Sequence, residues 1–143
     1  MILLDTTVLL YAVNQDAHQH QQARGWLDDA LSGAATVGFA WVALLGFLRI
    51  STRAGVLPRP LRLDRALSVT DAWLQQPPSV VVHPTAGHQR VLAQLLEAVG
   101  VGGNLLTDAH LAALALEHRA SIASFDRDFD RFPGVHRVTP GAG

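Results

Sequence analysis

The stretch from Asn104 to Asp130 reads NLLTDAHLAALALEHRASIASFDRDFD, and it decides the fold. Its first half has apolar residues at three-to-four spacing without an internal glycine or proline, which predicts a helix. Thr107 or Asn104 can cap this helix, so Asp108 falls in the first turn, where a carboxylate suits the positive end of the helix dipole. Residues 121–125 then read as a short buried strand, and Asp126 follows where that strand should end.

The chain begins with a second pattern of a strand followed by an aspartate. Met1–Leu4 is apolar and uncharged, as a central parallel strand would be, and Asp5 follows it with two threonines that can cap a short helix. Ligands bind outside the carboxyl ends of parallel strands, so Asp5, Asp108 and Asp126 can face one crevice. Each aspartate alone is equally consistent with an ordinary helix cap.

Three clustered carboxylates predict a bound cation. Anions at close range repel one another, and a cation is the usual remedy in proteins. A set of ligands made only of oxygen atoms favours Mg²⁺ or Mn²⁺ over zinc.

The composition limits the class of protein. A chain of 143 residues is most simply one domain, and a hydrophobic fraction of 49% excludes intrinsic disorder. The absence of cysteine excludes disulfides and thiolate metal sites. No charge-free apolar run approaches the roughly 18 residues of a membrane span, and Asp5 interrupts any signal-peptide pattern. We therefore expect a protein of the cytoplasm that does not associate with membranes.

All the basic residues are arginines, because the sequence contains no lysine. A net charge of −1 gives no overall attraction to nucleic acid, although a local arginine face can still meet phosphates through bidentate contacts. Arg49 is the only charge in the apolar segment 41–52. Two interpretations of it stay open: a side chain that extends to solvent at the helix edge, or a cation directed at the carboxylates or at a substrate phosphate. Arg53 and Arg127 are further candidates for phosphate contact.

The remaining segments alternate between strand and helix patterns, which predicts an α/β fold with a central, mainly parallel sheet flanked by helices. Segment 41–52 is apolar nearly all round, so we expect it to be central to the fold or to lie at a subunit interface. The glycines of 100–103 predict a hinge. The expected helices are 17–31, 41–52, 63–74 and 87–99, and the expected strands are 34–39, 80–82 and 135–138.

Three motifs in this order resemble the PIN-domain nucleases and, more narrowly, the VapC toxins of type II toxin–antitoxin systems. The motifs are DTTVL at 5–9, NLLTDAHLAA at 104–113 and SFDRDF at 124–129. The resemblance implies a PIN-like three-layer fold over a single domain, residues 1–143. It also implies an Mg²⁺- or Mn²⁺-dependent endoribonuclease acting on RNA of the tRNA or rRNA class, usually a homodimer, held inactive by a VapB-type antitoxin.

Motif matching transfers roles to individual residues of this chain. Asp5, Asp108 and Asp126 take the acidic positions that bind the metal and carry catalysis. Asp128 is a candidate fourth metal ligand, and Thr7 matches the polar residue that follows the first aspartate.

One departure from the family pattern leaves an alternative open. The pattern commonly has a glutamate in the helix after the second strand, and by register this position falls near Gly46. The sequence has glutamate only at Glu97 and Glu117. Either the carboxylate set is incomplete, which would reduce activity, or Asp128 compensates. An incomplete set would suit a degenerate PIN domain that binds RNA or a protein without catalysis. A phosphate-handling receiver or phosphatase is a weaker rival, because the chain lacks both lysine and an Asp-x-Asp pair after its first strand.

Overall fold

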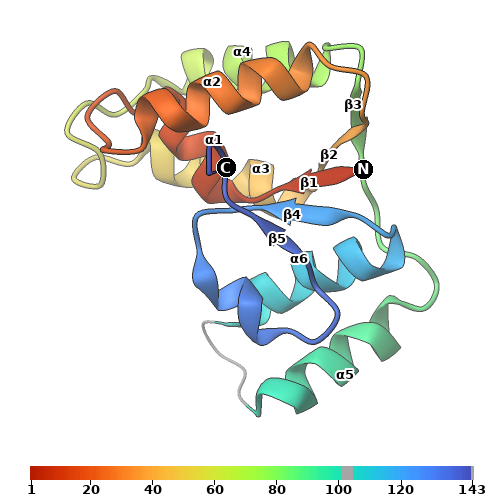
Figure 1. Ribbon diagram of the computed structural model, residues 1–143. Coiled ribbons are helices and arrows are strands. Elements are labelled where there is room, and N and C mark those ends of the chain that lie inside the picture. Colours follow the sequence, from red (N-terminus) through yellow and green to blue (C-terminus); the bar gives the residue numbers. More distant parts are fainter. Residues whose placement is uncertain (101–104, 143) are drawn as a thin grey trace.

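The central sheet has five strands in the order β3-β2-β1-β4-β5 (Figure 1). The computed structural model describes residues 1–100 and 105–142. All four strand pairings are parallel, as the sequence predicted. Four of these strands are shorter than predicted, and β3 keeps its predicted length but lies one residue earlier. The strands are β1 Ile2–Leu4, β2 Val37–Phe39, β3 Ser79–Val81, β4 Ser121–Ala123 and β5 Arg137–Val138.

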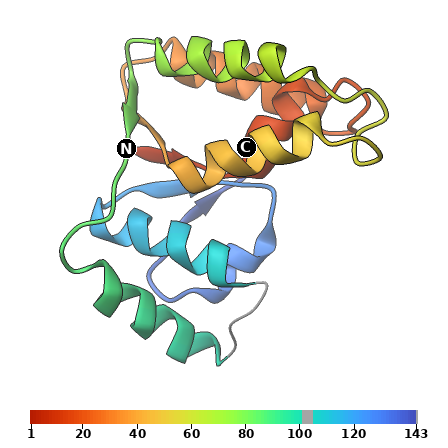
Figure 2. The same ribbon diagram turned by 180° about the vertical axis from the view of Figure 1, so that it is seen from behind.

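Helices cover both faces of the sheet and complete a three-layer α/β fold. Helices α1 to α4 lie on one face, and α5, α6 and the 3-10 helix η2 lie on the other (Figures 1 and 2). None of the helices in the described part of the chain combines the length and apolar composition needed to cross a bilayer. The helices are α1 Thr6–Val13, α2 His20–Leu31, α3 Trp41–Thr52, α4 Leu63–Leu74, α5 His88–Val99, α6 Leu106–Glu117 and η2 Arg127–Arg131.

Alternation along the strands divides the core into two clusters, one on each face of the sheet. Leu3 and Ile122 pack with the buried residues of α6. Leu4 and Ala123 pack with α1, α2 and α3. Helix α3 contributes Phe47 and other fully buried side chains to the second cluster, so the apolar segment 41–52 is central to the fold as predicted.

Helix boundaries agree with the sequence best where apolar periodicity sets them. Helices α3 and α4 have the predicted bounds. The predicted cap Thr107 is wrong, because α6 begins at Leu106 and Leu105 holds the N-cap position without a side-chain hydrogen bond. The other predicted cap, Asn104, and the hinge residues 101–103 lie outside the described residues. Asp108 lies in the first turn of α6, as expected.

The strand order changes direction at β1, which creates the position for a site. The chain continues from β1 to β2 on one side and returns later to β4 on the other. In open α/β sheets the crevice at such a switch point, outside the carboxyl ends of the strands, is where ligands bind. Leu4 pairs with Ala123, so Asp5 and Ser124 leave the sheet side by side. The backbone N–H of Asp5 donates to the carbonyl oxygen of Ala123 at 3.0 Å, which fixes this neighbourhood.

Candidate active site

A cleft of about 600 Å³ opens at the carboxyl edge of the sheet, between α1, α3 and α6. The three aspartates predicted from strand ends and helix start, Asp5, Asp108 and Asp126, all border it. The other lining residues are Thr6, Thr7, Leu10, Val42, Leu45, Gly46, Arg49, Ile50 and Thr107.

Asp5 is held at the base of this cleft by two hydroxyl groups. Thr7 Oγ1 donates to Asp5 Oδ2 at 2.8 Å, and Ser124 Oγ donates to the same oxygen at 2.6 Å. The residue is buried, and this burial raises the pKa of the Asp5 carboxyl even though both hydroxyls favour its charged form. Asp5 is therefore a carboxylate fixed in place on one oxygen.

Ser124 connects the ends of β1 and β4, a role that sequence reasoning missed. Its hydroxyl donates to Asp5 and accepts a hydrogen bond from the backbone N–H of Asp126 at 2.9 Å. The N–H of Phe125 donates to Thr7 Oγ1 at 3.2 Å. The available signal is a hydroxyl residue two positions before the strand-end aspartate, at a position that the sequence assigns to the strand 121–125.

Asp108, Asp126 and Asp128 form the tightest group of carboxylates. One oxygen from each lies within 4.8 Å of the other two. Asp126 Oδ1 also accepts the N–H of Asp128 at 2.9 Å and so caps η2. Burial raises the pKa of Asp108 to about 7, and the negative charges of Asp126, Asp5 and Asp128 add to this effect.

These oxygen atoms fit a divalent cation of the magnesium or manganese type. Such ions take carboxylate and water oxygens, and they remove the repulsion that disfavours the charged form of Asp108. Asp128, which the sequence offered only as a fourth ligand, lies within the tight group. Asp5 borders the same cleft and is near enough to Asp108 to affect its pKa.

Gly46, near which the family resemblance predicts a glutamate position, lies against Thr6. A Cβ atom on Gly46 would lie 2.8 Å from Thr6 Oγ1, which donates to the carbonyl oxygen of Ala43 at 3.1 Å. Neither glutamate of the chain lines the cleft. Glu117 lies at the other end of α6, where Thr85 donates to it and His88 Nδ1 is 2.6 Å from its Oε2.

Arg49 is the one of the three proposed phosphate-binding arginines that lines the cleft. Among the described residues Arg49 has no ion-pair partner, so its guanidinium remains available to an anion. Arg53 follows the end of α3, and Arg127 is the exposed first residue of η2. Arg49 is exposed, so its position fits both interpretations: a side chain that extends to solvent at the helix edge, and a cation at the cleft that carries the carboxylates.

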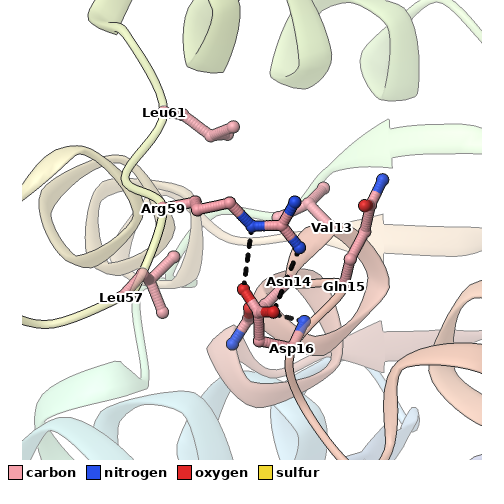
Figure 3. Close-up of a pocket in the computed structure, with 7 residues that line it drawn as sticks. All are labelled: Val13, Asn14, Gln15, Asp16, Leu57, Arg59 and Leu61. Atoms are coloured by element: carbon pink, nitrogen blue, oxygen red, sulfur yellow. Dashed lines mark hydrogen bonds and ion pairs between the residues drawn. The ribbon is translucent and has the colours of Figure 1, made fainter.

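A second pocket, of about 190 Å³, contains a carboxylate that is neutralised by an arginine (Figure 3). Arg59 Nε and Nη2 donate to the two oxygens of Asp16 at 3.2 and 3.0 Å. The only carboxylate in this pocket already has a cation, in contrast to the group at the sheet edge.

Comparison with known proteins gives consistent relatives over nearly the whole chain. Residues 2–135 match the model of the PIN domain family. The chain is 53% identical over 142 residues to Ribonuclease VapC37 of Mycobacterium tuberculosis, covering 99% of each chain. It is 38% identical to Ribonuclease VapC33 of the same species, covering 98% of each. Its fold is similar to VapBC2 from Rickettsia felis, solved with promoter DNA, with a TM-score of 0.70, 20% identity and 96% and 98% of the two chains covered.

The contact between Gly46 and Thr6 predicts a measurable coupling. Gly46→Ala should lower the free energy of unfolding by roughly 1–2 kcal/mol, because overpacking costs about 1–3 kcal/mol while alanine returns up to about 1 kcal/mol of helix propensity. In a Thr6→Ala background the close atoms are gone and the same change should be neutral or stabilising. Urea unfolding of the four proteins in a double-mutant cycle measures this; equal effects of Gly46→Ala in both backgrounds would contradict it.

The raised pKa of Asp108 predicts that the metal-free protein loses stability as the pH rises. The carboxyl has an ordinary pKa of 3.8 and a folded value of about 7, so its stabilising contribution is complete at low pH and is lost as the pH rises to neutrality. One pKa unit corresponds to about 1.4 kcal/mol, and solvent screening of this partly exposed group leaves an expected loss of roughly 1–2 kcal/mol. Urea unfolding in EDTA between about pH 5 and about pH 8 tests this. Asp108→Asn should flatten the profile; an unchanged slope in that variant would assign the effect to other groups.

Proposed function

This chain belongs to the PIN domain family, and on that premise we propose that it is a toxin-type endoribonuclease neutralised by a VapB-type antitoxin. The observation that carries the proposal is its 53% identity, over 99% of both chains, to a protein named as a ribonuclease. The cleft supports it with clustered carboxylates on one side and Arg49 among the other lining residues. We further propose that residues 1–143 act as a single PIN domain.

We propose that Asp108, Asp126 and Asp128, together with Asp5, hold Mg²⁺ or Mn²⁺. When bound, such an ion would lower the pKa of a water molecule and stabilise charge on the phosphate that is cleaved. Hydrogen bonds within the chain orient the carboxylates that would hold the ion. Ser124 and Thr7 fix the orientation of Asp5, and Ser124 also accepts the backbone N–H of Asp126.

The charges of the cleft suit a phosphodiester. Hydrolysis adds water across a P–O bond, so that one product keeps the phosphate and the other a hydroxyl. Arg49 would contact a non-bridging phosphate oxygen, a contact for which the guanidinium fork is well shaped. Asp126 would hold the metal or orient the attacking water, and Asp108 must lose its proton before it can act as a ligand.

The RNA target that we propose is of the tRNA or rRNA class. Among proteins of similar fold, VapC20 of Mycobacterium tuberculosis is described as a toxin that cleaves the sarcin-ricin loop; it has a TM-score of 0.67 at 18% identity. Cellular RNA as substrate would place the activity of this chain in the cytoplasm.

The partners that we propose are a second copy of the chain and an antitoxin. On α3, Trp41 and Leu45 expose 48% and 58% of their surface. These two side chains lie one helical turn apart, and an apolar patch that extends around them would suit contact with another protein. The similar Rickettsia felis structure is described as a VapBC complex, which supports the antitoxin.

A second candidate function is a non-catalytic PIN domain that binds RNA or a protein. The observation that favours it is Gly46, which leaves α3 without a carboxylate in the cleft. The position of Asp128 within the acidic group weighs against it.

We predict that Asp5→Asn removes RNA cleavage while the fold is kept. The amide has nearly the shape of the carboxylate but lacks its charge, so the reaction should lose several kcal/mol of metal-dependent stabilisation and slow at least about a hundredfold. The metal-free variant should be as stable as the parent or slightly more so, because one repelling anion is gone. Cleavage of total tRNA and rRNA with Mn²⁺ or Mg²⁺, with EDTA as the negative control, measures the first effect, and thermal unfolding the second.

Asp29→Asn, an exposed aspartate on α2, is the matched control and should cleave as the parent does. If Asp5→Asn cleaves RNA at the parent's rate, the site assignment is wrong. If the parent binds RNA and cleaves none with either metal, the non-catalytic module is the correct function.

We also predict that the isolated protein sediments as a dimer through the exposed face of α3. A tryptophan anchor in an interface contributes at least about 2 kcal/mol, so Trp41→Glu should raise the dimer Kd at least about thirtyfold. Val56→Glu changes an exposed valine in the loop after α3 and serves as the control. Analytical ultracentrifugation over a concentration series measures the Kd. A monomeric parent would reject the homodimer.

A further inference from the structure

Arg137, on the short edge strand β5, contacts both ends of the segment that carries Asp126 and Asp128. Its Nε and Nη2 donate to the two carboxylate oxygens of Asp130 at 2.9 and 3.0 Å. Its Nη1 donates to the carbonyl oxygen of Ser124 at 3.2 Å. Only 13% of the Arg137 side chain is exposed, so this guanidinium is held inside the structure rather than extended into solvent.

The segment between these two contacts needs an external constraint. Asp126, Asp128 and Asp130 alternate along it, and three carboxylates so close in sequence repel one another. Much of the segment is a 3-10 helix, whose hydrogen bonds have poorer geometry than those of an α-helix. Arg137 neutralises Asp130 in a bidentate pair and leaves Asp126 and Asp128 for the group with Asp108.

The contact with Ser124 extends the effect of Arg137 to the base of the cleft. The carbonyl oxygen of Ser124 accepts from Arg137, while its hydroxyl donates to Asp5 and accepts from the N–H of Asp126. A shift of the Ser124 backbone would therefore move the groups that orient two carboxylates. Arg137 Nη1 also donates to Thr139 Oγ1 at 2.6 Å, so the guanidinium makes four hydrogen bonds to three residues.

We propose that Arg137 is a positioning residue, which holds residues 124–130 in the shape that brings Asp126 and Asp128 to Asp108. The inference rests on the proposed function, because positioning matters only if these carboxylates bind a metal. Arg137 acts through Asp130 and Ser124 and need not touch the substrate. An arginine is required, since lysine keeps the charge but lacks the planar fork that reaches a carboxylate and a carbonyl at once.

The matched comparison is Arg137→Lys with Arg59→Lys. Arg59 forms the same bidentate pair with Asp16, but at a different pocket (Figure 3). Loss of a residue that orients metal ligands costs about 10–100-fold in metal affinity. Calorimetric titration with Mn²⁺ should therefore show binding about 10–100-fold weaker in Arg137→Lys and unchanged in Arg59→Lys. Thermal unfolding identifies any general loss of stability in either variant.

Amide hydrogen exchange of the metal-free proteins measures the positioning directly. The N–H groups of Asp126 and Asp128 donate within the segment, and they should exchange faster in Arg137→Lys than in the parent or in Arg59→Lys. If Arg137→Lys does not fold, Asp130→Asn replaces it. That variant keeps the contact of Arg137 with Ser124, so the same changes are expected at smaller size.

The outcomes separate this inference from the proposed function. Unchanged exchange of Asp126 and Asp128 overturns the role of Arg137, whatever the metal affinity. Faster exchange with an unchanged Mn²⁺ affinity also overturns it, provided that Asp108→Asn loses the metal. A parent protein that binds no Mn²⁺ overturns the metal-dependent function itself and the positioning role with it.

Discussion

The parallel register of β1 with β4 is the constraint on which the site depends. It sets Leu4 beside Ala123, so the two residues that follow, Asp5 and Ser124, leave the sheet as neighbours although they are 119 positions apart in the sequence. A slip of one residue would turn the strand side chains to the opposite face and separate the hydroxyl from the carboxylate. The two core clusters, which need Leu3 and Leu4 on opposite faces, therefore also fix the geometry of the cleft.

The same arrangement that concentrates carboxylates also opposes their ionisation. Asp108, with a pKa raised to about 7, is the residue in which this conflict is largest, because burial and its neighbours both disfavour its charge. Hydrogen-bond donors fixed by the fold offset part of this repulsion. Two hydroxyls donate to Asp5, a backbone N–H donates to Asp126, and a guanidinium donates to Asp130.

Residues with a local signal could be predicted from the sequence, and residues defined by contacts between distant segments could not. Asp5 and Asp126 follow apolar strands, and Asp108 opens a periodic helix, so each was identifiable from its neighbours alone. The roles of Ser124 and Arg137 depend on contacts between distant segments, which form only when β4 pairs with β1 and with β5. The predicted cap Thr107 was wrong although it rested on a local signal. Helix α6 begins at Leu106, before Thr107, and its N-cap residue makes no side-chain hydrogen bond. Strand β4 ends at Ala123 rather than at the predicted residue 125, and the next residue, Ser124, donates its hydroxyl to Asp5.

Helix α3 supplies none of the carboxylates that line the cleft. Thr6 occupies the space beside Gly46, and the only charged residue that α3 contributes to the cleft lining is Arg49. The tight carboxylate group comes instead from α6 and from the segment that starts η2. Anions then lie on the side of α6 and η2 and a cation on the side of α3, an asymmetry that would orient a phosphate between them. The geometry of the site therefore depends on the segment that starts η2, because it carries two of the three closely grouped carboxylates, Asp126 and Asp128.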